Sequence, residues 1–130
     1  MGYLSDVAIC LTKEGYKGLR KEFLKKDVLQ CSVFDKVTFI NAKGNETDEA
    51  SCSYVILKAI DTKWYENDEY FPGVELVMNY LKDNSSTMSY HLIIIGECID
   101  DIREESNIVD NDNDIISFLY IKRSIECITY

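Results

Sequence analysis

Carboxylates are the side chains of this sequence whose number and spacing could support chemistry. One arginine and eight carboxylates lie between residues 97 and 114. The carboxylates are Glu97, Asp100, Asp101, Glu104, Glu105, Asp110, Asp112 and Asp114. Grouped carboxylates can perform general acid–base catalysis, hold Mg²⁺, or imitate the phosphate array of a nucleic acid. A fourth explanation is an edge strand or loop that its charge keeps soluble.

Asp110, Asp112 and Asp114 alternate with asparagines, as at the start of a calcium-binding loop. An EF-hand loop also needs glycine at its sixth position and a bidentate glutamate at its twelfth. Ile115 and Ile121 occupy those positions here, which excludes an EF-hand. We therefore expect no metal site of this kind and no cofactor, and interpret the acidic segment as a solvated edge or loop.

The sequence contains no motif for a catalytic nucleophile, a phosphate-binding loop or a zinc protease site. His91 is the only histidine, and alternation along a strand would place it on one face with Ser89, Ile93 and Ile95. We expect a structural role for it. The five cysteines are dispersed singly, which suits neither a disulfide framework nor a zinc site and favours the reducing cytoplasm.

An aromatic cluster offers an alternative binding surface. Trp64, Tyr65, Tyr70 and Phe71 lie within eight residues, directly before a predicted helix. Exposed aromatic side chains often dominate protein interfaces, whereas buried ones would close the core over the start of the helix. We expect Trp64 to be buried and keep Trp64, Tyr65 and Tyr70 as the alternative interface.

Composition and charge bound the class of protein. The chain has 130 residues, a usual size for one domain, and a net charge of −9. Residues 1–36 hold seven Lys/Arg and five Asp/Glu, a balance of +2, and residues 37–130 hold seven and eighteen, a balance of −11. This charge argues against direct binding to nucleic acid or to an anionic membrane. It favours a basic protein surface as partner, including that of a nucleic-acid-binding protein.

Hydrophobic periodicity predicts the elements that position these residues in one globular domain, residues 1–130. In chain order it predicts a strand at 5–11, a helix at 13–26 capped by Thr12, strands at 33–40 and 52–60, a helix at 72–83, a strand at 92–95 and strand character at 115–130. The unbroken apolar run 92–95 indicates a strand buried on both faces. The order β-α-β-β-α-β-β predicts an α+β fold, with two helices on one face of a mixed or mostly antiparallel sheet.

Several short motifs carry a resemblance to a known group of proteins. They are Lys63-Trp64-Tyr65, Pro72-x-Val74, Tyr80-Leu81, Ile95-Gly96-Glu97 and Asp100-Asp101-Ile102. Together with the opening Ser5-Asp6-Val7-Ala8, they resemble a group of small acidic proteins of phages and bacterial genomes. The resemblance implies a phage or mobile-element setting, where small acidic proteins include inhibitors of host defence of the anti-CRISPR type. No catalytic residue carries over from it.

The leading hypothesis is a non-enzymatic inhibitor or adaptor that binds a basic protein surface through its acidic residues. One alternative is a divalent-cation-dependent enzyme acting on a nucleotide or small molecule, with Asp100 and Asp101 as ligands. A second alternative is an immunity protein, or a homo-oligomeric structural protein formed by pairing of edge strands.

Overall fold

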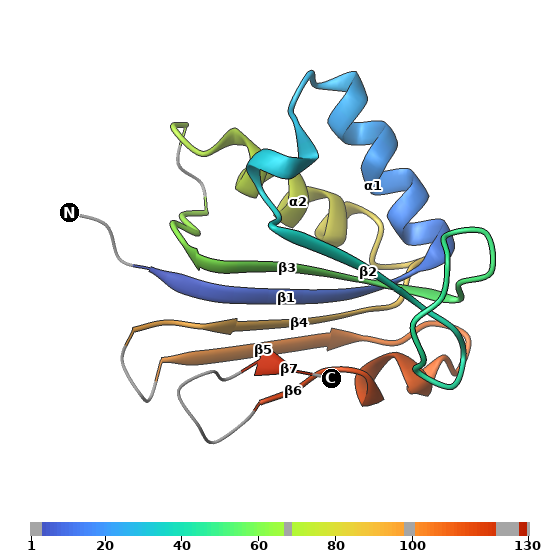
Figure 1. Ribbon diagram of the computed structural model, residues 1–130. Helices are drawn as coiled ribbons and strands as arrows, with labels where there is room; N and C mark the ends of the chain where they lie inside the picture. Colours follow the sequence, from blue (N-terminus) through green and yellow to red (C-terminus); the bar gives the residue numbers. More distant parts are fainter. Residues whose placement is uncertain (1–3, 67–68, 98–100, 122–127, 130) are drawn as a thin grey trace.

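A five-stranded antiparallel sheet forms the centre of the molecule (Figure 1). The computed structural model describes residues 4–66, 69–97, 101–121 and 128–129. The sheet order is β2-β3-β1-β4-β5, and each neighbouring pair of strands is antiparallel. The strands are β1 (Ser5–Thr12), β2 (Lys36–Ile40), β3 (Tyr54–Thr62), β4 (Tyr90–Ile95) and β5 (Ile102–Asn107).

Two α-helices, α1 (Lys13–Lys25) and α2 (Pro72–Asp83), cover one face of this sheet (Figure 1). α1 connects β1 to β2 through the short 3₁₀ helix η1 (Gln30–Ser32), and α2 connects β3 to β4. This is the ferredoxin-like β-α-β-β-α-β arrangement, with β5 added at the edge. The predicted α+β class is confirmed. Within the described residues, no helix combines the length and the apolar composition that crossing a bilayer requires.

Local sequence explains where both helices begin. Oγ1 of Thr12 accepts a hydrogen bond from Gly15 N at 3.0 Å, which confirms the predicted cap of α1. Pro72 occupies the first turn of α2, where the N–H that proline lacks would have no helical partner. Each helix buries one stripe. The buried residues are Gly15, Tyr16, Leu19 and Phe23 on α1, and Gly73, Val74, Val77 and Leu81 on α2.

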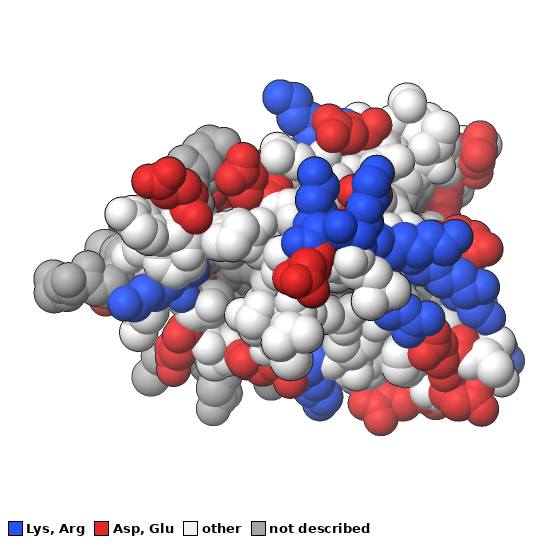
Figure 2. All heavy atoms as spheres, turned by 90° about the horizontal axis from the view of Figure 1, so that it is seen from above, with Lys and Arg blue, Asp and Glu red and all other residues white. Residues whose placement is uncertain are grey.

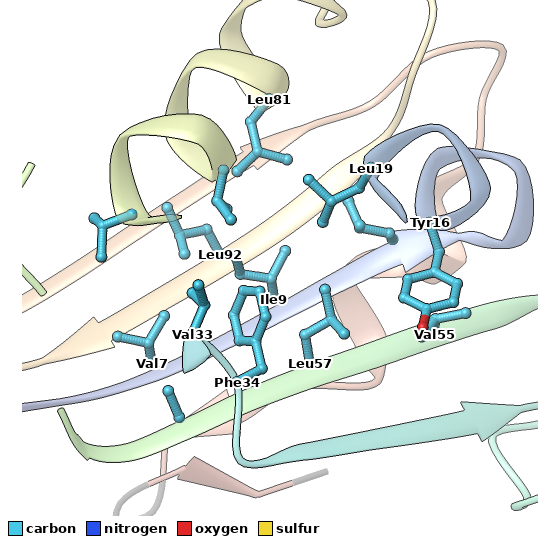
Figure 3. Packing of buried hydrophobic residues seen from close by; sticks show 14 of the residues in the cluster. Val7, Ile9, Tyr16, Leu19, Val33, Phe34, Val55, Leu57, Leu81 and Leu92 are labelled. Atoms are coloured by element: carbon cyan, nitrogen blue, oxygen red, sulfur yellow. The ribbon is translucent and has the colours of Figure 1, made fainter. Parts of the chain in front are cut away.

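The helices and the sheet enclose the larger of two hydrophobic clusters (Figure 3). Leu19 of α1 and Leu81 of α2 point toward the sheet, where Ile9, Leu57 and Leu92 project between them. All five side chains are at most 2% exposed. Burial of each contributes about 1.5–3 kcal/mol, so this cluster supplies much of the driving force for folding.

Residues 113–119, after β5, cover part of the opposite face of the sheet. The 3₁₀ helix η2 (Asn113–Ser117) buries Ile115, and the Phe118 ring lies 4.9 Å from the Tyr54 ring, measured between centroids. The second cluster comprises Ala8, Cys10, Ile40, Tyr54, Ile56, Ile93, Ile95, Ile115, Phe118 and Leu119. Because both faces of the sheet are covered, the apolar run of β4 is buried on both, as predicted.

The end of the chain differs from the predicted strand at 115–130. Residues 113–117 form η2, and beyond it the described residues form strand only in β6 (Tyr120–Ile121) and β7 (Ile128–Thr129), which pair as a second small sheet. Ile115, Phe118 and Leu119 pack on the far face of the sheet instead, and residues 122–127 and 130 of the predicted strand lie outside the described residues. Packing against that face outweighs the local preference of these residue types for strand.

Candidate functional site

The acidic segment 97–114 does not form one continuous surface. β5 lies in its middle, and its six residues span about 20 Å. Asp100 lies outside the described residues. The other carboxylates outside β5 are Glu97 and Asp101 at one end of the strand, and Asp110, Asp112 and Asp114 at the other. The structure therefore divides the predicted binding residues into separate groups.

Glu97 and Asp101 lie on either side of residues 98–100, between β4 and β5. The backbone N of Gly96 donates to the carbonyl oxygen of Asp101 at 2.7 Å. The Glu97 carboxylate accepts a hydrogen bond from the backbone N of Leu4 at 2.5 Å. Both acidic side chains are exposed at this end of the sheet.

Glu104 and Glu105 point to opposite faces of the sheet, because neighbouring residues of a strand alternate. Glu104 lies on the η2 side, where its Oε2 is 2.6 Å from Nε2 of His91. Glu105 lies on the helix side, where its Oε2 accepts from Nε of Arg103 at 2.5 Å. Arg103 also donates to Glu66 at 2.5 Å. The two carboxylates are therefore engaged on different surfaces.

His91, Glu104 and Cys10 bring together the residue types of a nucleophilic site. Cys10 faces His91 across β1 and β4, and both are buried, with His91 only 1% exposed. Burial, with a smaller contribution from Asp112, raises the pKa of the Cys10 thiol. A nucleophilic cysteine must ionise to the thiolate, which this environment opposes. Nε2 of His91 lies 2.6 Å from Oε2 of Glu104, and Nδ1 has no hydrogen-bond partner among the described residues.

The carboxylates after β5 lie on a turn that is fixed to the sheet. We call residues 108–114 the acidic turn. Asp110 and Asn111 have φ values of 55° and 60°, a left-handed conformation that Asp and Asn adopt more readily than most residues. The backbone N of Val109 donates to Oγ of Ser89 at 2.8 Å, and this hydroxyl lies 3.3 Å from the Val109 carbonyl. These contacts attach the acidic turn to the start of β4.

Asp112 fastens the other end of the acidic turn. Its Oδ1 accepts a hydrogen bond from the Tyr54 hydroxyl at 2.5 Å. Burial of this hydroxyl, followed by its bond to Asp112, raises the pKa of Tyr54, so that it remains a donor. Asp110 and Asp114 are exposed. Within the described part of the chain, neither forms an ion pair with Lys or Arg.

A hollow of about 430 Å³ adjoins the acidic turn. Its lining residues are Thr12, Thr87, Ser89, Val109, Asp110, Asn111 and Asp112. Six of these seven residues carry a side-chain oxygen, and none is basic. The hollow therefore offers hydrogen-bond acceptors and negative charge to whatever enters it.

Carboxylates could also bind a metal ion together with other protein ligands. Among the residues that the structure describes, no group of three or more His, Cys, Asp or Glu side chains is placed to hold a metal ion. Of the two ligands expected for the cation-dependent alternative, Asp101 is exposed just before β5 and Asp100 lies outside the described residues.

The aromatic alternative is divided between core and surface. Trp64 is 7% exposed, which confirms its expected burial, and its ring centroid lies 5.9 Å from that of Phe34. Tyr65 is half-buried and makes an edge contact with Phe71, at 5.1 Å between centroids. Tyr70 is 81% exposed. Of the three predicted interface residues, Tyr70 is thus the one that a partner could reach most fully.

Sequence reasoning missed a groove on the helix side of the molecule. This interhelix groove, between α1 and α2, has a volume of about 770 Å³. Its lining includes Lys21 and Lys26 on the α1 side, and Glu75 and Asp83 on the α2 side. Figure 2 shows Lys and Arg side chains gathered over α1 on this face. Six of the fourteen Lys and Arg of the chain fall between residues 13 and 26, with two carboxylates among them.

Gly18 of α1 allows the close approach of α2 at this groove. The Tyr80 hydroxyl donates to the carbonyl oxygen of Gly15 at 2.7 Å. A Cβ atom on Gly18 would collide with the same hydroxyl. Two glycines within a helix cost about 1 kcal/mol each relative to alanine. Their spacing of three residues was the available sign that another element approaches this side of α1.

Comparison with known proteins gives no assignment for these surfaces. No family model matches the chain, and no curated protein or solved structure matches it. Their function has to be argued from their own geometry.

Proposed function

We propose that this protein is a non-enzymatic binding protein that engages a basic surface of another protein through the acidic turn. The observation that carries the proposal is the oxygen-rich hollow between the acidic turn and the sheet. A lysine or arginine side chain fits its chemistry, because all N–H groups of these side chains are donors and the hollow supplies acceptors. Hydrogen bonds between charged groups are stronger than neutral ones, so one inserted side chain can anchor the complex.

The fixed conformation of the acidic turn supports this proposal. Ser89 and Tyr54 hold the turn at both ends, and Ile115 is fully buried just after it. A binding loop that is already ordered loses less conformational entropy on association. The exposed carboxylates of Asp110 and Asp114 would also attract a basic partner from a distance and speed the encounter.

The setting of this activity is a further part of the proposal. The resemblance to small acidic phage proteins supports an inhibitor of a host-defence protein of the CRISPR type, in which carboxylates take the place of nucleic-acid phosphates. The free thiols of Cys10, Cys31 and Cys52 support action in the reducing cytoplasm. The same surface would serve an adaptor or immunity protein, because each must recognise a basic partner.

The test compares two charge-matched double variants. The first, Asp110→Asn/Asp114→Asn, removes the two exposed carboxylates of the acidic turn and keeps Asp112, which anchors it. The control, Asp27→Asn/Glu69→Gln, removes two exposed carboxylates elsewhere. A partner captured from host lysate is identified, purified and titrated calorimetrically against each protein. We expect the first variant to bind at least tenfold more weakly, a loss of about 1.4 kcal/mol, and the control to bind like the wild type.

Three results would contradict the proposal or a part of it. Unchanged affinity in the Asp110/Asp114 variant would show that the acidic turn is not the interface and would direct attention to Tyr70. Affinity that does not fall with added salt would reject the electrostatic part. Turnover of a nucleotide that requires Mg²⁺ and disappears in the Asp110/Asp114 variant would establish the enzymatic alternative.

A further inference from the structure

The interhelix groove carries opposite charges on its two sides. Lys21 and Lys26 line the α1 side, where Glu22 partly offsets them, and Glu75 and Asp83 line the α2 side. Among the described residues, none of these five side chains takes part in an ion pair. A molecule that covers this groove must therefore match a positive strip and a negative strip lying side by side.

We propose that a second copy of this chain covers the interhelix groove in a two-fold symmetric dimer. A two-fold axis parallel to the helices places α1 of each copy over α2 of the other. The lysines of one copy then face the carboxylates of its partner, and the contact occurs twice because a two-fold interface repeats each interaction. An axis across the helices would instead place α1 against α1, and like charges would oppose that arrangement.

The net charge of −9 on each copy does not prevent this dimer. At physiological ionic strength the screening length is about 8 Å, so repulsion between distant charges is weakened while charges in contact still interact. The acidic turn lies on the other side of the sheet from the interhelix groove. The dimer would therefore leave the acidic turn of each copy accessible, and the proposal stands independently of the proposed function.

A charge-exchange experiment tests the dimer. One variant, Lys21→Glu/Lys26→Glu, makes both sides of the groove acidic, and a second, Glu75→Lys/Asp83→Lys, makes both sides basic. The full chain is studied by sedimentation equilibrium from micromolar to millimolar concentration. We expect a wild-type mass of twice 15.0 kDa, a mass of 15.0 kDa for each variant alone, and recovery of the dimer in their equimolar mixture.

A charge-matched control variant changes two lysines outside the interhelix groove. Lys36→Glu/Lys43→Glu changes the net charge by the same amount on β2 and the loop after it, and should remain dimeric. Circular dichroism verifies folding, and Lys21→Gln/Lys26→Gln replaces the first variant if charge reversal disturbs α1. A monomeric wild type would assign the groove to another occupant and overturn the proposal. Variants that stay dimeric alone, or a mixture that stays monomeric, would also overturn it.

Discussion

Cys10 lies on β1 with its side chain fully buried. Burial, and secondarily Asp112, raises the pKa of its thiol above the ordinary value of 9.0. An unfolded chain would ionise this thiol near that ordinary value, whereas the folded chain keeps it protonated. The unfolded state therefore binds fewer protons once the pH exceeds about 9, so this contribution to stability is complete below that pH and is lost above it.

We predict that Cys10→Ala makes the unfolding free energy less dependent on pH at alkaline pH. The slope between about pH 9.5 and pH 11 should become shallower by up to about 1.4 kcal/mol per pH unit, the value for one proton. Urea unfolding at a series of pH values measures it. Cys31→Ala, which removes an exposed thiol, serves as the matched control. Equal slopes in wild type and Cys10→Ala would contradict the prediction.

At the scale of elements, the contact between α1 and α2 depends on the absence of a side chain at Gly18. The helices meet where the Tyr80 hydroxyl lies over Gly15 and Gly18 and donates to the Gly15 carbonyl. Alanine is a better helix former than glycine by about 1 kcal/mol, which would favour a Gly18→Ala substitution in an isolated helix. In the folded protein the new methyl group would displace Tyr80, so the steric effect opposes the local preference.

We predict that Gly18→Ala destabilises the protein in the wild-type background and does so less when combined with Tyr80→Phe. Removing the hydroxyl takes away the atom that the new methyl group meets first, although the ring carbon behind it stays at 3.2 Å. Urea unfolding of both single variants and the double variant gives the coupling energy, which should lie between about 0.5 and 3 kcal/mol. Additive effects would show that the two residues do not constrain each other.

At the scale of the whole molecule, the sheet separates two layers with different charge. The helices lie on one side, with six basic residues between positions 13 and 26, and η2 and the acidic turn lie on the other. The second layer is joined to the sheet by apolar packing of Ile115, Phe118 and Leu119. The position of the acidic turn should therefore depend on a core that lies outside the ferredoxin-like part of the fold.

We predict that Phe118→Ala lowers the unfolding free energy by about 3–5 kcal/mol, because the ring is buried against Tyr54 in the second cluster. Ile116→Ala provides the control within η2, since Ile116 is 42% exposed, and should cost much less. Thermal or urea unfolding compares the two. Equal losses would mean that the layer formed after β5 is not part of the cooperative core.

Predictions that depend on interactions within one segment agree with the structure, whereas those that depend on distant residues do not. The helix predicted at 72–83 is found at Pro72–Asp83, because a proline at the start and apolar residues at helical spacing act within one segment. The unbroken apolar run at 92–95 likewise predicted burial on both faces of a strand. Residues 115–119 were predicted as strand but form the end of η2 and its connection to β6, because their conformation depends on a sheet surface formed by distant residues. Strand is found at Tyr120–Ile121 and Ile128–Thr129, within the same predicted segment.

The sequence by itself determined the α+β class, the order of the elements from β1 to β4, the burial of Trp64 and the uneven charge along the chain. Only the tertiary structure decided how the acidic residues are presented. It placed Glu104 and Glu105 on opposite faces, and held Asp112 to Tyr54, which lies 58 residues away. It also formed the interhelix groove from Gly18 and Tyr80. The physical reason is that element formation depends on neighbouring residues, whereas a surface is composed of residues that only packing brings together.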